Sequence, residues 1–194
     1  KARANVDQWL KADVDTIIIT ASGCGTTIKD YGHMLRLDPA YAEKAANVAA
    51  KARDVTEFLA TLDLPPQLMQ LRVTYHSACS LQHGQKIAGT AQALLRHAGF
   101  TVSDVPEGHL CCGSAGTYNI MQPEIAGQLK ARKQANIHST HPHVVAAGNI
   151  GCITQLADGL NAPILHTIEL LDWAYGGPKP AKVTEAAKTE TERH

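Results

Sequence analysis

Short apolar runs of the kind that form buried strands alternate with segments of helical periodicity along most of this chain. The predicted strands occupy residues 16–20, 71–77, 100–105, 143–148 and 163–167. The predicted helices cover residues 3–12, a segment opened by Thr26 or Thr27, and residues 40–61, 85–98, 123–138, 152–159 and 168–175. This alternation predicts an α/β fold with one or more mainly parallel sheets built from strand-loop-helix units.

All five cysteines follow a predicted strand and lie close to the start of a helix. They are Cys24, Cys79, Cys111, Cys112 and Cys152. The carboxyl ends of parallel strands meet at one edge of a sheet, where ligands bind. We therefore expect most of the sulfur atoms to converge. An odd number of cysteines without a secretory signal also argues against a disulfide framework.

Two segments of the chain are similar to each other. The aligned stretches are "IIITASGCGTT" (17–27) and "VVAAGNIGCIT" (144–154). They predict two related cysteine-rich repeats, of which the first is incomplete. We assign residues 1–66 to the remainder of the first repeat and 67–176 to a complete second domain. Residues 177–194 contain few apolar residues and are expected to be a disordered tail.

Thiolates are soft ligands that hold iron–sulfur clusters and zinc. Cys79, Cys111, Cys112 and Cys152 offer four of them, and Cys24 a fifth. The side chains of two adjacent cysteines in extended backbone point apart, so Cys111 and Cys112 can reach different atoms of a cluster. In the loops around these residues, backbone amides close to the cluster are expected at Gly113, Gly116 and Gly151. Candidates for supporting contacts to the sulfurs are His76, His109 and Asn149.

Three other interpretations remain open at this point. The thiols could be ordinary packing residues, since free cysteine is often buried. A structural zinc module that docks other subunits would use the same ligands. A thiol–disulfide enzyme would use a strained bond between Cys111 and Cys112.

The charge pattern excludes some classes of partner. The chain has 18 basic and 18 acidic residues, which predicts no nucleic-acid binding. No apolar run is long enough for a transmembrane segment, and we expect a cytoplasmic protein.

The cysteine pattern resembles the cysteine-rich CCG domain found in heterodisulfide reductases and their relatives. That family pattern is a lone Cys, then Cys-Cys-Gly, then Cys-x-x-Cys. Over about residues 1–180 the chain is closer to the iron–sulfur subunits of bacterial glycolate oxidases. The similar stretches are "ASGCGTTIKDYGHML", "YHSACSLQHGQKI", "CCGSAGTYNI" and "HTIELLDWAYGGPKP". One departure is that Asn149 and Ala21 stand where the fuller pattern has the first cysteine of Cys-x-x-Cys.

The resemblance implies an electron-transfer subunit with a 4Fe-4S cluster, or alternatively zinc, on the remaining cysteines. It also implies FAD-containing partner subunits that oxidise glycolate to glyoxylate, so no catalytic residue is nominated here. Association with the inner face of a membrane through such partners is compatible with this assignment. A lactate oxidase or a complex of the heterodisulfide reductase type remains the alternative.

Overall fold

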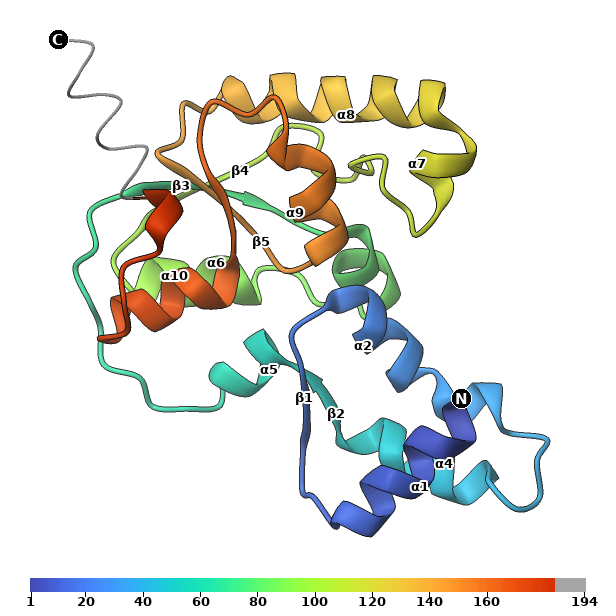
Figure 1. Ribbon diagram of the computed structural model, residues 1–194. Coiled ribbons are helices and arrows are strands. Elements are labelled where there is room, and N and C mark those ends of the chain that lie inside the picture. Colours follow the sequence, from blue (N-terminus) through green and yellow to red (C-terminus); the bar gives the residue numbers. More distant parts are fainter. Residues whose placement is uncertain (184–194) are drawn as a thin grey trace, which may run out of the picture.

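The structure, a computed structural model, describes residues 1–183 and contains two parallel sheets flanked by helices (Figure 1). The larger sheet has four strands in the order β4-β3-β5-β6. Every neighbouring pair in it is parallel. The strands are β3 (Arg72–His76), β4 (Thr101–Asp104), β5 (Val144–Ala147) and β6 (Ile164–His166). The predicted α/β class with mainly parallel sheets is confirmed.

Helices cover both faces of the four-stranded sheet, which explains why β5 is apolar at every position. Val144 and Ala146 pack in one core with α6 (Thr90–His97) and α10 (Thr167–Ala174). Val145 and Ala147 pack in a second core with α8 (Pro123–His138) and α9 (Ile150–Ala157). Alternate residues of a strand point to opposite faces, so a strand covered on both sides needs no polar residue.

The N-terminal part forms a smaller unit with its own core. Its elements are α1 (Ala2–Ala12), β1 (Ile17–Ile19), α2 (Ser22–Lys29), α3 (Tyr31–Met34), α4 (Ala42–Lys51), β2 (Ala52–Asp54) and α5 (Val55–Leu59). Strand β1 pairs with β2 in parallel. Val6, Ile17 and Val48 are buried together between these elements.

The prediction of one helix over residues 40–61 was wrong, because β2 interrupts it. Asp54 ends this strand and accepts a hydrogen bond from the amide of Thr56 (2.9 Å). Glu57 in turn accepts one from the amide of Asp54 (2.8 Å). This is a capping box, which starts the new helix α5. The Ala-rich sequence favours helix locally, but pairing with β1 outweighs that preference.

Two further helix starts differ from the prediction. Helix α2 begins at Ser22 rather than at Thr26 or Thr27, so Cys24 lies in its first turn. The segment 85–98 is helical only in α6, and a short π-helical turn, η1 (Ser80–Gly84), precedes it. Both changes place a helix start nearer to a cysteine.

The two units are joined by hydrogen bonds around Ser22, a buried residue at the start of α2. Its hydroxyl lies 2.7 Å from that of Ser80 and accepts a hydrogen bond from the Asn149 side-chain amide at 2.9 Å. Its backbone amide donates to the carbonyl of Gly148 at 3.3 Å. These contacts place α2 beside the loops that follow β3 and β5 (Figure 1).

The small unit repeats the succession of strand, cysteine and capped helix that is found in part of the large unit. Cys24 is the fifth residue after Ile19, which ends β1, and Cys152 is the fifth after Ala147, which ends β5. Ile19 pairs with Asp54, and Ala147 pairs with His166. Asp54 and His166 each form a capping box at the start of the following helix. These features support two related repeats, which we retain, with the bounds 1–66 and 67–176, as a proposal.

Part of the segment expected to be disordered, residues 184–194, lies outside the described residues. Val183, at the end of the described part, is buried and belongs to the core between the sheet, α6 and α10.

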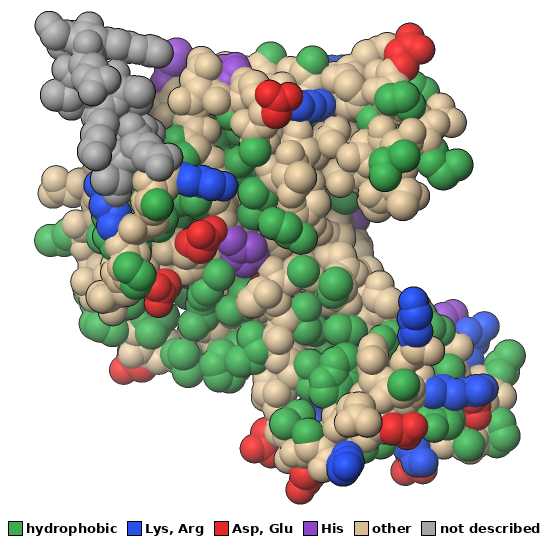
Figure 2. Space-filling view, viewed as in Figure 1, with side chains coloured by type: hydrophobic (Ala, Val, Ile, Leu, Met, Phe, Trp, Pro, Cys, Tyr) green, Lys and Arg blue, Asp and Glu red, His purple; other side chains and the backbone are tan. Residues whose placement is uncertain are grey.

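Charged side chains of both signs are interspersed on the face shown in Figure 2. This arrangement agrees with the balanced count of acidic and basic residues. Within residues 1–183, no helix combines the length and the apolar character that crossing a lipid bilayer requires.

Candidate metal centre

Four of the five cysteines lie at the carboxyl edge of three neighbouring strands, either in the loop after the strand or at the start of the helix that follows. Cys79 follows β3, the pair Cys111 and Cys112 follows β4, and Cys152 follows β5. These strands are parallel and adjacent in the sheet. The sheet topology therefore carries the loops to one edge, as the sequence predicted.

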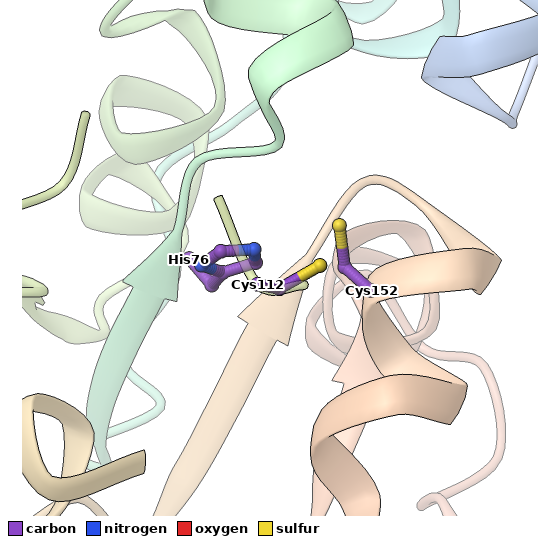
Figure 3. A group of neighbouring side chains, drawn as sticks. All are labelled: His76, Cys112 and Cys152. Atoms are coloured by element: carbon purple, nitrogen blue, oxygen red, sulfur yellow. The ribbon is translucent and has the colours of Figure 1, made fainter. Parts of the chain in front are cut away.

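The centre of this cluster is buried. Ligand atoms of His76, Cys112 and Cys152 all lie within 4.8 Å of one another. Figure 3 shows these three side chains together, one at the end of β3, one from the loop after β4 and one from the start of α9. All three residues are less than 6 % exposed. Nε2 of His76 has no hydrogen-bond partner among the described residues.

Cys111 and Cys79 extend the cluster toward the surface. Cys111 is half-buried and Cys79 is exposed. Hydrogen bonding by the thiol of Cys112, and to a smaller extent by that of Cys79, lowers the pKa of Cys111 to about 2. Interaction with Cys111 and burial raise the pKa of Cys79. Neighbouring thiols therefore shift each other's pKa, and Cys111 is the one that most readily becomes a thiolate.

Cys152 is the second thiol that favours the charged form. The neighbouring thiol of Cys112 lowers the pKa of Cys152 to about 5, with a further contribution from the His76 imidazole. The pKa of Cys112 is raised by Cys111 and by Cys152. The pKa shifts of Cys79, Cys111, Cys112 and Cys152 thus alternate in direction, which is the response of closely packed acids that share protons.

The glycines in the loops allow close approach of the backbone. Gly113 has a φ of +91°, and a Cβ atom there would lie 2.5 Å from the carbonyl oxygen of Ala126. Its amide donates a hydrogen bond to the sulfur of Cys111 at 3.3 Å. Gly116 also has a positive φ, but open space surrounds it. A Cβ on Gly151 would lie 3.1 Å from both Asn149 and Ser114.

Asn149 is a helix cap and a cross-link. Its side-chain oxygen accepts a hydrogen bond from the amide of Gly151 at 2.8 Å, at the start of α9. Its side-chain nitrogen donates to Ser22 and, at 3.2 Å, to Ser80. Asn149 therefore fixes the helix that carries Cys152 to the loop that carries Cys79.

Cys24 and His109, two further predicted site residues, are exposed. Cys24 lies on α2. The charge of His109 helps to lower the pKa of Glu107. Neither residue belongs to the group formed by His76, Cys112 and Cys152.

Helix α8 contributes residues that the sequence did not single out. Lys133 is 1 % exposed, and its Nζ donates a hydrogen bond to the carbonyl of Glu107 at 2.9 Å. The side chain of Asn136 donates to the carboxylate of the same residue at 2.8 Å. Arg132 completes the contact with Nε at 2.8 Å from that carboxylate. Together these residues clamp the turn that leads into the cysteine pair.

The donor set fits a soft metal centre. It combines four thiols with a buried, unpartnered imidazole nitrogen, and two of the thiols favour the charged form that ligates metal. Iron–sulfur clusters commonly take four such ligands, and zinc takes four thiolates or three with one imidazole. Both kinds of centre are compatible with these residues.

Comparison with known proteins shows which proteins this fold and site resemble. Residues 73–157 match the family model described as a cysteine-rich domain, CCG. This segment contains β3 to α9 and all four clustered cysteines. Residues 73–157 are therefore similar to the CCG cysteine-rich domains.

Individual relatives of known name narrow this similarity to particular groups of proteins. The chain is 40 % identical over 181 residues to the glycolate oxidase iron-sulfur subunit of Escherichia coli K12. It is 30 % identical over 187 residues to a probable glycolate oxidase iron-sulfur subunit of Bacillus subtilis. Both alignments cover 90 % of this chain but only 44 % and 42 % of the relatives, so the chain spans less than half their length. The resemblance predicted from the sequence is confirmed.

A third relative has a different name. The lactate utilization protein A of Bacillus licheniformis is 28 % identical over 165 residues, with 80 % of this chain and 69 % of that protein covered. Similarity thus extends to two groups of proteins that are named for different 2-hydroxy acids.

Proposed function

We propose that this chain is part of the iron–sulfur electron-transfer subunit of a flavin-dependent glycolate oxidase. Its cluster would be of the 4Fe-4S type, held by Cys79, Cys111, Cys112 and Cys152, with Cys24 outside the ligand set. The observation that carries this proposal is that four cysteines lie at the carboxyl edge of three neighbouring parallel strands, with Cys112 and Cys152 buried beside His76. Similarity to the two glycolate oxidase subunits supports the choice of complex.

The residues of the centre supply ligands and an environment rather than substrate chemistry. A four-iron cluster bound there supplies one-electron transfer. The Gly113 amide donates to the Cys111 sulfur, and backbone amides directed at sulfur stabilise its negative charge. Removal of hydrogen from glycolate is assigned to the FAD of a partner subunit. A cytoplasmic location, with attachment to the inner face of the membrane through partners, belongs to the same proposal.

A cluster is preferred to the zinc alternative because of the geometry of the adjacent pair. Cys112 is buried beside His76 and Cys152, whereas Cys111 is half-buried and Cys79 is exposed. The four cysteines thus extend from the buried interior to the surface, and this spread suits a cluster of several metal and sulfur atoms better than a single metal ion. A Cys3His zinc site would use only the buried end of this group together with one further thiol.

The first experiment identifies the metal. The protein is purified without oxygen, and iron, zinc and acid-labile sulfide are measured together with the EPR spectrum after reduction. We expect about four iron and four sulfide per chain. In the matched pair Cys152→Ser and Cys24→Ser, only the first should lose the cluster. One zinc and no sulfide in the wild-type protein would reject the electron-transfer proposal.

The second experiment identifies the electron donor. The full-length subunit is co-purified with its partners, and reduction of the cluster is followed after adding glycolate or D-lactate. Reduction by glycolate is expected, at a rate well above that with lactate. Faster reduction by lactate would move the assignment to the group of lactate utilization proteins.

A further inference from the structure

Lys133 is the largest fully buried side chain in the described part of the protein. It lies on α8, and its ammonium group has one hydrogen bond, to the carbonyl oxygen of Glu107. An ammonium group carries three donors. Lysine is almost never fully buried unless its charge is paired, so this position requires an explanation.

No carboxylate among residues 1–183 forms a salt bridge with Lys133. The carboxylate of Glu107 is engaged by the guanidinium of Arg132 on the outer side of the turn. A buried amine without a carboxylate partner keeps its charge only where other negative groups stabilise it. The sequence position alone gives no sign of this, because lysine in a helix is usually exposed.

The ammonium of Lys133 and the amide of Leu110, which directly precedes the cysteine pair, bond to the same carbonyl oxygen of Glu107 at 2.9 and 3.0 Å. Burial lowers the pKa of Lys133, and the charges of Cys112, Glu107, Cys111 and Cys152 oppose that shift. Three of these four groups are proposed ligands. The turn held by the lysine ends at Leu110. The side chain therefore lies within electrostatic range of the centre.

We propose that the buried ammonium of Lys133 is the internal counter-charge of the cysteine centre and sets its reduction potential. Reduction adds one negative charge to a centre already surrounded by thiolates. A fixed positive charge in a poorly screened interior stabilises the reduced form more than the oxidised form. Lys133 therefore raises the potential. This inference rests on the proposed iron–sulfur function, and it concerns a residue that is not itself a ligand.

The test measures the reduction potential by EPR-monitored titration of the cluster-loaded, full-length subunit. Lys133→Met removes the charge and keeps most of the volume, and Lys133→Gln removes the charge but keeps a donor for Glu107. Both should be harder to reduce by about tenfold in the equilibrium constant, which for one electron is about 59 mV. Lys133→Arg, which retains the charge, should stay near the wild-type value.

Lys130 provides the matched control. It lies on the same helix one turn earlier, but its ammonium is paired with the exposed carboxylate of Asp158 at 3.2 Å. Lys130→Met removes the same charge from a solvent-screened position, so its potential should match that of the wild type.

The other possible results with the Lys133 variants either support or overturn the counter-charge assignment. If both neutral variants have the wild-type reduction potential, the counter-charge assignment is overturned. A potential that shifts in Lys133→Met but not in Lys133→Gln also overturns it, because that pattern indicates that the side chain only positions the turn. Loss of the cluster in the neutral variants but not in Lys133→Arg supports the assignment, whereas loss in all three assigns the residue to packing. A wild-type protein without any cluster would instead contradict the proposed function.

Discussion

The carbonyl oxygen of Ala126 occupies the space where a side chain on Gly113 would begin, at 2.5 Å from the position of a Cβ atom. Ala126 is buried on α8, and Gly113 directly follows the cysteine pair. The helix and the loop can approach this closely only because residue 113 lacks a side chain. The position of the Cys111 and Cys112 sulfurs therefore depends on one missing methyl group.

Gly113→Ala should destabilise the protein by ~2–4 kcal/mol, from the strained positive φ and from the contact with Ala126. The matched control is Gly116→Ala, which has a positive φ but no atom within 4 Å and should cost only ~1 kcal/mol. Urea denaturation of the two variants measures the difference. If both variants lost the same free energy of unfolding, helix α8 would move away from the added methyl group without destabilising the protein.

Asn149→Ala should lower the free energy of unfolding by about 2 kcal/mol, because the α9 cap and the bonds to Ser22 and Ser80 are lost together. Asn149→Ser keeps a capping oxygen and should lose about half as much. Thermal unfolding checks both values. If the serine variant were as unstable as the alanine variant, the cross-link rather than the cap would be the main contribution.

Acid should weaken the turn before the cysteine pair. Hydrogen bonds from Arg132 and Asn136 lower the pKa of Glu107 from 4.5 to about 2. A carboxylate with a lowered folded-state pKa stabilises the protein fully above the unfolded-state value and loses this effect as the pH falls toward the folded-state value. The metal-free wild-type protein should therefore lose stability between about pH 5 and pH 2.

Glu107→Gln is the control for this titration. It lacks the ionisable group, so the change in its urea midpoint over the same pH interval should be smaller than that of the wild type. Identical pH profiles would show that the contact with Arg132 is fully screened by solvent.

The large-scale arrangement was predictable because apolar strands in a sheet covered on both faces give an unmistakable pattern. Strand β5 is buried at every position, and the cysteines at the strand ends then follow from the rule for parallel sheets. Strand β2 was missed because its three residues have no pattern of their own. The capping box of Asp54 and Glu57 was the available signal that a new helix begins there.

The polar supports of the site were less predictable, since they depend on contacts between distant segments. Ser22 and Asn149 are 127 residues apart in the chain and meet only in the folded protein. His76 could be nominated from its proximity to Cys79, whereas Lys133 could not, because its burial results from how α8 packs on the loop. The sequence thus nominated the candidate ligands and some of their supports, such as Gly113 and Asn149, but not Ser22 or Lys133.

The order of strands in the large sheet also governs when the centre can be assembled. Strand β3 is made early but lies between β4 and β5, and the last of the four clustered sulfurs is at residue 152. A chain still emerging from the ribosome cannot gather these thiols until nearly the whole domain has been synthesised. Loading of the proposed inorganic group is therefore a late event in the biogenesis of this domain.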